Sequence, residues 1–304
     1  MPFPSRSRRW GLRALALIVS SLMLVPAPPV IAAGRTRTVQ VGQVSIAYRI
    51  VGHGRPLLLL QGSGAAMDVW DPLMVAELAE DRRVIVFDYR GVGGSSDEPD
   101  TPMTIDLLAK DTAGLMRKLD LSRADVLGWS LGGFVAQRLA QLYPARVRRL
   151  VLVSTDAGGG RAVLATPEIR ELDARVTLGQ ATIEEILSLL FPSDRLEAGR
   201  AWLERYFSQP DCCESVPYET GVRQLESIDA WYSGPGAWDG LEQMAQPTLV
   251  LRGSQDINVP PKNGRAIAER IPDAKLITFN DAGHGLPMQE PILIAAVIGA
   301  FLDS

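Results

Sequence analysis

Histidine and cysteine are scarce in this chain, with two of each among 304 residues. The two cysteines, Cys212 and Cys213, are adjacent, and with one distant histidine they do not match the spacing of zinc ligands, so no metal site is predicted. Adjacent Cα atoms lie about 3.8 Å apart, below the usual range for a relaxed disulfide. This favours free thiols, with a vicinal disulfide and an intermolecular bridge as the alternatives.

A basic stripe is also missing beyond the first thirteen residues, and the formal net charge is −4. A nucleic-acid-binding surface needs such a stripe, so nucleic acid is not expected as a partner. Hydrophobic residues make up 46% of the chain and charged residues 22%, which is typical of a globular protein rather than a disordered one. No feature of the composition predicts an oligomeric state.

The first 33 residues have the pattern of an export signal. Four arginines, the last of them Arg13, precede an apolar run at residues 14–25, which prolines and two alanines follow. This order is typical of a signal peptide, and the run is shorter than the roughly twenty apolar residues that a membrane span needs. Residues 7–13 also resemble the twin-arginine motif, so both export routes stay open. After removal of residues 1–33 we expect an exported protein of net charge −8 with no membrane span, whereas an uncleaved signal would tether it.

The order of the remaining segments predicts an α/β fold. Residues 38–41 and 44–51 alternate apolar and polar side chains around a Gly-Gln turn, as in a β-hairpin at a sheet edge. The short apolar runs that follow indicate strands covered on both faces, and helical stretches alternate with them, as in a mostly parallel eight-stranded sheet flanked by helices. The apolar runs are residues 57–60, 84–87, 125–127, 150–153, 248–251 and 276–279, and the helical stretches are residues 72–79, 105–119, 131–143, 261–270 and 291–302.

One segment, residues 161–240, breaks this alternation. It is predicted to be a helical cap inserted after strand six. The core then consists of two parts, residues 34–160 and residues 241–304. It contains no strand-like run, whereas apolar residues recur at helical spacing within residues 183–190 and 202–207. The segment also holds eight of the nineteen aromatic residues. This excess either builds the core of a small lobe or faces an apolar substrate.

A serine stands at a tight turn between a predicted strand and a predicted helix. Residues 128–132 read Gly-Trp-Ser-Leu-Gly and fit the pattern G-x-S-x-G in the strand-turn-helix context that gives this motif its meaning. A serine hydroxyl is a poor nucleophile unless a strained turn holds it beside a base. Ser130 is therefore the predicted catalytic nucleophile.

The predicted catalytic base is His284, which lies in a glycine-containing loop just after the last strand. The other histidine, His53, stands in a short polar turn and is expected to be solvated. Asp256, which follows strand seven, is the predicted carboxylate that orients the imidazole and stabilises its charged form. Asp156 is the competing candidate because it follows strand six, whose end faces the same region.

Together these motifs resemble those of α/β-hydrolase-fold serine hydrolases with a helical cap, over nearly all of residues 36–304. Residues 88–95, Asp-Tyr-Arg-Gly-Val-Gly-Gly-Ser, are similar to the family's D-x-R-G-x-G-x-S stretch. The order of Ser130, Asp256 and His284 along the chain is also that of the family. No cofactor is expected.

The resemblance further implies an oxyanion hole made of two backbone N–H groups, those of Leu131, directly after the nucleophile, and of Ser63, in the loop after strand three. The chain departs from the family in this loop, because Gln61 stands where the family usually has a histidine. An amide side chain can still donate and accept hydrogen bonds, so we expect activity to survive.

The resemblance implies an enzyme but leaves its reaction open, because this fold hosts many activities. A serine nucleophile argues against the haloalkane dehalogenase and epoxide hydrolase branches, which attack with aspartate. Carboxylesterase, enol-lactonase, carbon–carbon-bond hydrolase and cofactor-free perhydrolase reactions remain. An exported enzyme with an aromatic-rich cap fits a small or medium, apolar, ester-like substrate. The alternatives are a non-catalytic binding or signalling protein on the same scaffold, and an interaction protein that docks through the helical segment.

Overall fold

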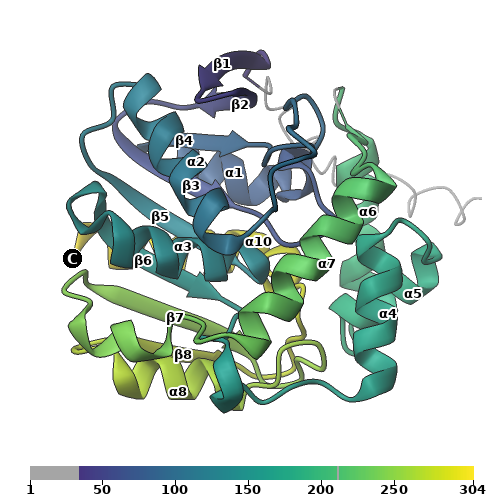
Figure 1. The fold of residues 1–304 in the computed structure, drawn as a ribbon. Helices are drawn as coiled ribbons and strands as arrows, with labels where there is room; N and C mark the ends of the chain where they lie inside the picture. The colour runs from purple at the N-terminus through teal and green to yellow at the C-terminus, as the bar shows by residue number, and fades with distance from the viewer. Residues whose placement is uncertain (1–33, 211) are drawn as a thin grey trace, which may run out of the picture. The chain divides into compact units, whose positions relative to one another are not determined.

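The computed structural model describes residues 34–210 and 212–304, so the predicted export signal at residues 1–33 lies outside the described residues. The strands of the described part form one sheet and are β1 (Arg37–Val41), β2 (Val44–Val51), β3 (Arg55–Leu60), β4 (Arg82–Phe87), β5 (Ala124–Trp129), β6 (Val147–Val153), β7 (Thr248–Gly253) and β8 (Lys275–Phe279). Their order in the sheet is β1-β2-β4-β3-β5-β6-β7-β8 (Figure 1). β2 pairs antiparallel with β1 and β4, and the other neighbours pair in parallel. The predicted mostly parallel eight-stranded sheet is confirmed.

Helices cover both faces of this sheet. The helices that flank it are α1 (Pro72–Ala79), α2 (Ile105–Lys118), α3 (Leu131–Leu142), α8 (Lys262–Arg270), α9 (Leu286–Gln289) and α10 (Pro291–Asp303). α2, α3 and α8 pack on one face, and α1 and α10 on the other. Successive strand residues point to opposite faces, so Leu58 packs on the first and Leu59 on the second, and both are fully buried. This two-sided cover explains the unbroken apolar runs of the central strands.

Four further helices lie between β6 and β7, and no strand is found in the described part of residues 161–240. They are α4 (Pro167–Thr177), α5 (Ile183–Leu190), α6 (Leu196–Phe207) and α7 (Tyr218–Ser233). We call residues 161–240 the helical insert. Figure 1 shows α4, α5 and α6 gathered beside the sheet rather than stacked on either face. Short 3-10 helices occur at η1 (Met67–Val69), η2 (Pro144–Arg146), η3 (Gly159–Arg161) and η4 (Trp238–Gln243).

Buried polar contacts fasten the helical insert to the sheet domain. Arg205 of α6 donates to both carboxylate oxygens of Asp71, at 2.9 and 2.6 Å to Oδ2 and 3.2 Å to Oδ1. The side chain of Gln224 in α7 accepts a hydrogen bond of 2.8 Å from the backbone N–H of Gly64. Because Gly64 belongs to the loop after β3, the insert is positioned directly against that loop. No helix within residues 34–210 and 212–304 is both long enough and apolar enough to cross a membrane.

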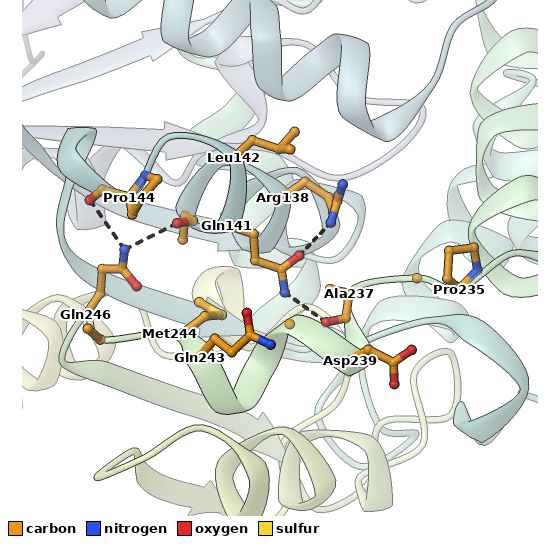
Figure 2. A pocket seen from close by; sticks show the side chains of 14 residues that line it. Arg138, Gln141, Leu142, Pro144, Pro235, Ala237, Asp239, Gln243, Met244 and Gln246 are labelled. Atoms are coloured by element: carbon orange, nitrogen blue, oxygen red, sulfur yellow. Dashed lines mark hydrogen bonds between the residues drawn. The ribbon is translucent and has the colours of Figure 1, made fainter.

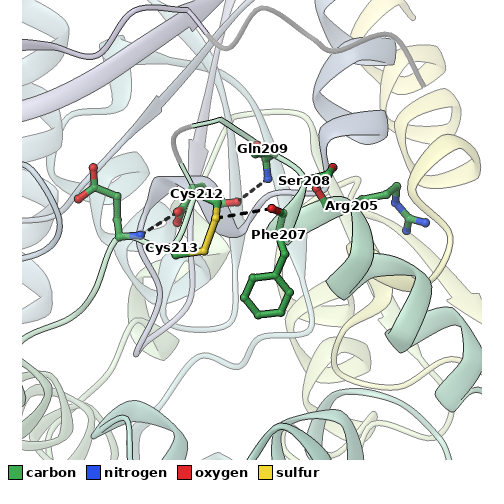
Figure 3. The surroundings of a disulfide bond; sticks show 8 residues. Arg205, Phe207, Ser208, Gln209, Cys212 and Cys213 are labelled. Carbon is green, nitrogen blue, oxygen red and sulfur yellow. Dashed lines mark hydrogen bonds between the residues drawn. A yellow bond between two sulfur atoms is a disulfide. The ribbon is translucent and has the colours of Figure 1, made fainter. Parts of the chain in front are cut away.

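The two cysteines form a vicinal disulfide, so the expectation of free thiols is wrong (Figure 3). The two residues lie in a local turn that adjacent Cα spacing does not reveal: Cys213 adopts φ +74°, and the backbone N–H of Cys212 donates to the carbonyl of Gln209. The N–H groups of Cys213 and Glu214 donate to the buried carboxylate of Asp68 in η1. The disulfide therefore lies in a loop whose backbone is fixed to the sheet domain.

Candidate active site

The turn between β5 and α3 holds Ser130 in an unusual backbone conformation. Its φ is +56° and its ψ is −124°, values that residues other than glycine rarely adopt. Glycines on either side make the turn possible: a Cβ at Gly132 would collide with the carbonyl oxygen of Leu60, and one at Gly128 would collide with Gly132. The sequence thus folds into a tight elbow that places the serine hydroxyl at the carboxyl end of β5.

The structure brings together the three side chains that the sequence predicted as catalytic. Nε2 of His284 lies 3.0 Å from Oγ of Ser130. Nδ1 of the same ring lies 3.0 Å from Oδ2 and 3.2 Å from Oδ1 of Asp256. They follow β5, β7 and β8, whose carboxyl ends meet at one edge of the sheet. Such a line of hydroxyl, imidazole and carboxylate can move a proton off the serine as it attacks.

Asp256 is held by its own loop. The backbone N–H groups of Asn258 and Val259 donate to Oδ1 at 3.0 and 2.8 Å, which leaves Oδ2 for the imidazole. The carboxylate is buried and hydrogen-bonded on both oxygens. A carboxylate so fixed selects the His284 tautomer in which Nδ1 carries the proton and Nε2 can accept one.

The competing carboxylate, Asp156, does not contact the imidazole. Its Oδ1 accepts from the N–H of Gly158 at 2.7 Å and from Nε1 of Trp231 at 3.2 Å, and its Oδ2 accepts from the hydroxyl of Tyr232 at 2.8 Å. Both oxygens are therefore occupied by partners in α7 and in the loop before η3. Asp156 fastens the helical insert rather than orienting His284.

The loop that carries His284 is fixed from two sides. Nε1 of Trp129, beside the nucleophile, donates to the carbonyl of His284 at 2.9 Å. The N–H of Gly285 donates to the carbonyl of Leu190 at the end of α5, at 2.7 Å. The imidazole position thus depends on both the elbow and the helical insert. His53 is exposed in the turn between β2 and β3, as expected.

The electrostatic surroundings of His284 favour its charged form. Burial by itself lowers the pKa of the imidazole, but the Asp256 carboxylate, together with the more distant Asp173 and Asp156, outweighs burial and raises the pKa above its ordinary value of 6.5. Because its pKa is raised, the imidazole stays protonated up to a higher pH, and while protonated it cannot accept the proton of Ser130.

We expect kcat/KM for an ester to increase with pH along a limb centred above 6.5. Only the neutral imidazole can accept the proton of Ser130, so activity is lost as pH falls through the raised pKa of His284 and is fully present above it. Initial rates from about pH 5 to about pH 9 at constant ionic strength measure the limb. A rate that does not change with pH over this range would contradict a histidine base.

The two predicted oxyanion donors lie next to the nucleophile. Leu131 is the first residue of α3, so no preceding helical turn supplies an acceptor for its N–H. Ser63 lines the same cavity as Ser130. The loop that carries it comes close to the elbow, because a Cβ at Gly62 would lie 3.3 Å from Cβ of Ser130. Both residues thus lie beside Ser130, where the donors of an oxyanion hole are expected.

Gln61 takes over the bracing of this loop from the family's histidine. Its side chain is fully buried, and its Nε2 donates to the carbonyl of Phe87 at the end of β4, at 3.0 Å. The loop after β3 is thereby fastened to the neighbouring strand. The amide makes a donor contact that an imidazole N–H could also make, which supports the expectation that activity survives with glutamine at this position.

Replacing Gln61 by leucine should lower kcat by about ten- to a hundredfold with little change in KM. The variant leaves the Phe87 carbonyl unpaired and loosens the loop that carries the Ser63 N–H, and complete loss of one oxyanion donor costs roughly a hundredfold or more. Steady-state kinetics and a thermal unfolding curve measure the two effects separately. Gln40→Leu, on the exposed face of β1, is the control. An unchanged kcat would show that Gln61 does not position the oxyanion hole.

Residues 88–95 support the same loop from the other side. The carboxylate of Asp88 accepts from the N–H of Met67 at 2.7 Å and from the N–H of Gly94 at 3.1 Å. Burial raises the pKa of Asp88 to about 6, although these backbone N–H groups oppose the shift. The motif therefore connects the loop after β4 to η1 and does not itself face the nucleophile.

A cavity of about 330 Å³ opens onto Ser130 and His284. Its apolar wall comes mainly from the helical insert and contains Val176, Ile183, Ile186, Leu189, Leu190, Trp202, Leu203 and Phe207. Other aromatic residues of the insert pack into the core instead, as Trp231 does by stacking on Phe134 at 4.9 Å. Some aromatic residues of the insert thus line the cavity, and others pack into the core.

Two polar residues of this cavity were missed in the sequence. Asp173 projects from α4, and Nδ2 of Asn258 donates to its Oδ1 at 2.9 Å. Asn258 stands two residues after Asp256, so its position near the site could have been predicted from the sequence. Asp173 stands among several other charged residues of α4, and no sequence pattern distinguishes it.

A larger cavity of about 550 Å³ lies elsewhere, between the carboxyl end of α3 and η4 (Figure 2). Its walls are bridged by amide side chains: Nε2 of Gln246 donates to the carbonyls of Ala140 and Pro144, and Nε2 of Gln141 donates to the carbonyl of Ala237. Its described lining residues include neither a histidine nor a serine. Two of the predicted catalytic residues, Ser130 and His284, line the smaller cavity instead.

Comparisons with known proteins agree with the observed fold. Residues 55–291 match the family described as alpha/beta hydrolase fold. The chain is 31% identical over 258 residues to a 2-hydroxymuconate semialdehyde hydrolase of Pseudomonas sp. (strain CF600), covering 83% of this chain and 88% of that protein. It is 32% identical over 278 residues to a poly(3-hydroxyalkanoate) depolymerase of Ectopseudomonas oleovorans, covering 88% and 92%. The structure of a thermophilic esterase from Thermogutta terrifontis superposes with a TM-score of 0.73 at 28% identity, covering 89% of this chain and 98% of that one.

Proposed function

This chain belongs to the α/β hydrolase fold family, and from that membership we propose that it is a serine hydrolase that cleaves a small or medium, mainly apolar carboxylic ester through an acyl-enzyme. The observation that carries the proposal is the hydrogen-bonded line from Ser130 through His284 to Asp256 at the base of a cavity of about 330 Å³. A hydroxyl held at a strained elbow beside a buried, oriented imidazole is an activated nucleophile.

In this mechanism Nε2 of His284 takes the proton of Ser130 as Oγ bonds to the ester carbonyl carbon. The N–H groups of Ser63 and Leu131 stabilise the developing oxyanion. The imidazolium then gives its proton to the departing alcohol, and the acyl group stays on Oγ. Water, deprotonated by the same imidazole, attacks the acyl-enzyme and releases the acid. Asp256 holds the imidazole in place and offsets its positive charge throughout.

The cavity supports an ester as substrate. Its walls are largely apolar, and an anionic substrate would meet Asp173 and Glu214 but no lysine or arginine among the described residues that line it. The similarity to an esterase and to a poly(3-hydroxyalkanoate) depolymerase points in the same direction. The similarity to a 2-hydroxymuconate semialdehyde hydrolase makes hydrolysis of a carbon–carbon bond the second candidate.

Labelling and turnover together test this proposal. The folded protein, residues 34–304, should react with a fluorophosphonate probe and hydrolyse methyl esters, with kcat/KM greatest for acyl chains short enough to fit a cavity of about 330 Å³. A pH-stat assay across acyl chains of about two to about ten carbons measures this preference. A folded protein that resists the probe and cleaves no ester would contradict the proposal and favour a non-catalytic binding role.

We further propose that residues 1–33 direct export to the periplasm or the extracellular space. Their arginines and apolar run support this, and the disulfide between Cys212 and Cys213 is of a kind that persists in an oxidising compartment. Cell fractionation and determination of the amino-terminal residue of the mature protein test it. Accumulation of the full-length chain in the cytoplasm would refute it.

A further inference from the structure

One carboxylate that has no role in the proposed mechanism, that of Asp173, lines the active-site cavity. Asp173 of α4 lines the cavity together with Ser130 and His284 and is partly exposed. Its Oδ1 accepts from Nδ2 of Asn258 at 2.9 Å, whereas its Oδ2 has no partner among the described residues. Oδ2 can therefore accept a hydrogen bond from a donor in the cavity.

The charges around Asp173 do not supply that donor. His284 and Asp256 lie near enough to affect its ionisation, Tyr232 faces it from α7, and Glu214 is a second acid on the cavity wall. Burial raises the pKa of Asp173, and the neighbouring His284 opposes the shift only in part. No lysine or arginine is found among the described lining residues, so a neutral donor on a bound ester can use this oxygen.

We propose that Asp173 accepts a hydrogen bond from a hydroxyl group of the substrate and thereby selects hydroxylated esters over plain and anionic ones. This inference rests on the proposed ester hydrolase function. A hydroxyl fits better than an ammonium group because the cavity that Asp173 lines has largely apolar walls, which make desolvation of a full positive charge costly. A substrate carboxylate would be repelled by Asp173 and Glu214. Asn258 fixes the orientation of the acceptor, so Oδ2 is presented to the cavity rather than to the loop after β7.

Pairs of esters that differ only by one hydroxyl group test the selection in a pH-stat assay. The wild-type protein should give a higher kcat/KM for methyl 3-hydroxybutyrate than for methyl butyrate, and for 2-hydroxyethyl butyrate than for ethyl butyrate. We expect a factor of about ten, the value of one hydrogen bond to a charged group. These two hydroxylated esters place the donor in the acyl and in the alcohol part, so they also show which part faces Asp173. Monomethyl glutarate should be the poorest substrate. Methyl 4-aminobutyrate should not exceed the hydroxylated esters.

The variants Asp173→Leu and Asp173→Asn remove the acceptor and the charge respectively. We expect the preference for the hydroxylated ester to disappear in Asp173→Leu and to fall about threefold in Asp173→Asn, which keeps an amide oxygen as a weaker acceptor. Glu171→Gln, an exposed acid two residues earlier on α4, is the control and should keep the full preference. If Asp173→Leu does not fold, the Asp173→Asn series carries the test alone.

A second readout separates selection from a general disturbance of the site. Asp173, Asp256 and Asp156 all raise the pKa of His284, so Asp173→Asn should move the acidic limb of kcat/KM to lower pH, and Glu171→Gln should not. A wild-type protein that hydrolyses methyl butyrate but shows no hydroxyl preference, a preference unchanged in both Asp173 variants, or a stronger preference for the ammonium ester would each overturn the inference. A wild-type protein that hydrolyses none of these esters would instead overturn the proposed function.

Discussion

Ser130→Ala should lower kcat for ester hydrolysis by at least about 10,000-fold and abolish labelling by a fluorophosphonate. The variant removes Oγ, the atom that forms the acyl-enzyme in the proposed mechanism, while the smaller alanine side chain leaves the elbow and both oxyanion N–H groups in place. Residual hydrolysis above the rate in water should remain, because the Ser63 and Leu131 donors still act on a bound ester and an added water. Single-turnover hydrolysis of 4-nitrophenyl butyrate measures the loss.

The fold of this variant should be unaffected, because the hydrogen bond of Oγ is to the imidazole and the backbone at the elbow is held by neighbouring residues. The backbone carbonyl of Ser130 keeps its hydrogen bonds from Gly133 N–H and the Thr155 hydroxyl. Ser188→Ala, an exposed serine on α5, is the matched control and should retain full activity. Full activity in Ser130→Ala would require another nucleophile and would remove the basis of the mechanism.

The sheet and the elbow could be predicted because they depend on local patterns. The apolar run at residues 57–60 falls within β3 (Arg55–Leu60), and the strand, glycine and serine of residues 128–132 form one continuous segment whose conformation follows from its own sequence. Parallel strands then bring Ser130, Asp256 and His284 to one edge, so their meeting followed from topology as soon as each was placed after a strand.

What escaped prediction depends on contacts between distant segments. Asp173 is one acid among several on α4 and acquires its place only when α4 packs over the nucleophile. The disulfide was missed for a related reason. Cys213 has a positive φ, and its N–H pairs with Asp68, which lies 145 residues away in the chain. The distance between adjacent Cα atoms does not reveal the turn that results. Asp156 and Asp256 each follow a strand, so the sequence alone does not show which of them orients the imidazole. In the structure Asp156 accepts from the hydroxyl of Tyr232, whereas Asp256 contacts the imidazole of His284.

Asp256→Asn should lower kcat by about 10,000-fold with little change in KM, since the amide fits the same space but no longer selects the useful tautomer of His284. An asparagine NH2 placed against Nδ1 favours the form in which Nε2 carries the proton, and that form cannot accept one from Ser130. The same variant should lower the pKa of His284, because Asp256 is the largest of the groups that raise it. A pH profile of the residual activity measures this shift.

Asp156→Asn, at a second buried carboxylate, should affect the stability of the protein more than its activity. It weakens the hydrogen bond to the Tyr232 hydroxyl and should cost about 1–3 kcal/mol of unfolding free energy, measured by urea denaturation, while kcat falls by less than about tenfold. A small move of the pH limb to lower pH should accompany it, since Asp156 also raises the pKa of His284. If Asp156→Asn instead loses activity by thousands and Asp256→Asn does not, the orienting carboxylate has been assigned to the wrong strand. Comparing the two variants therefore shows which carboxylate orients His284, because each substitution removes one negative charge and preserves the side-chain volume.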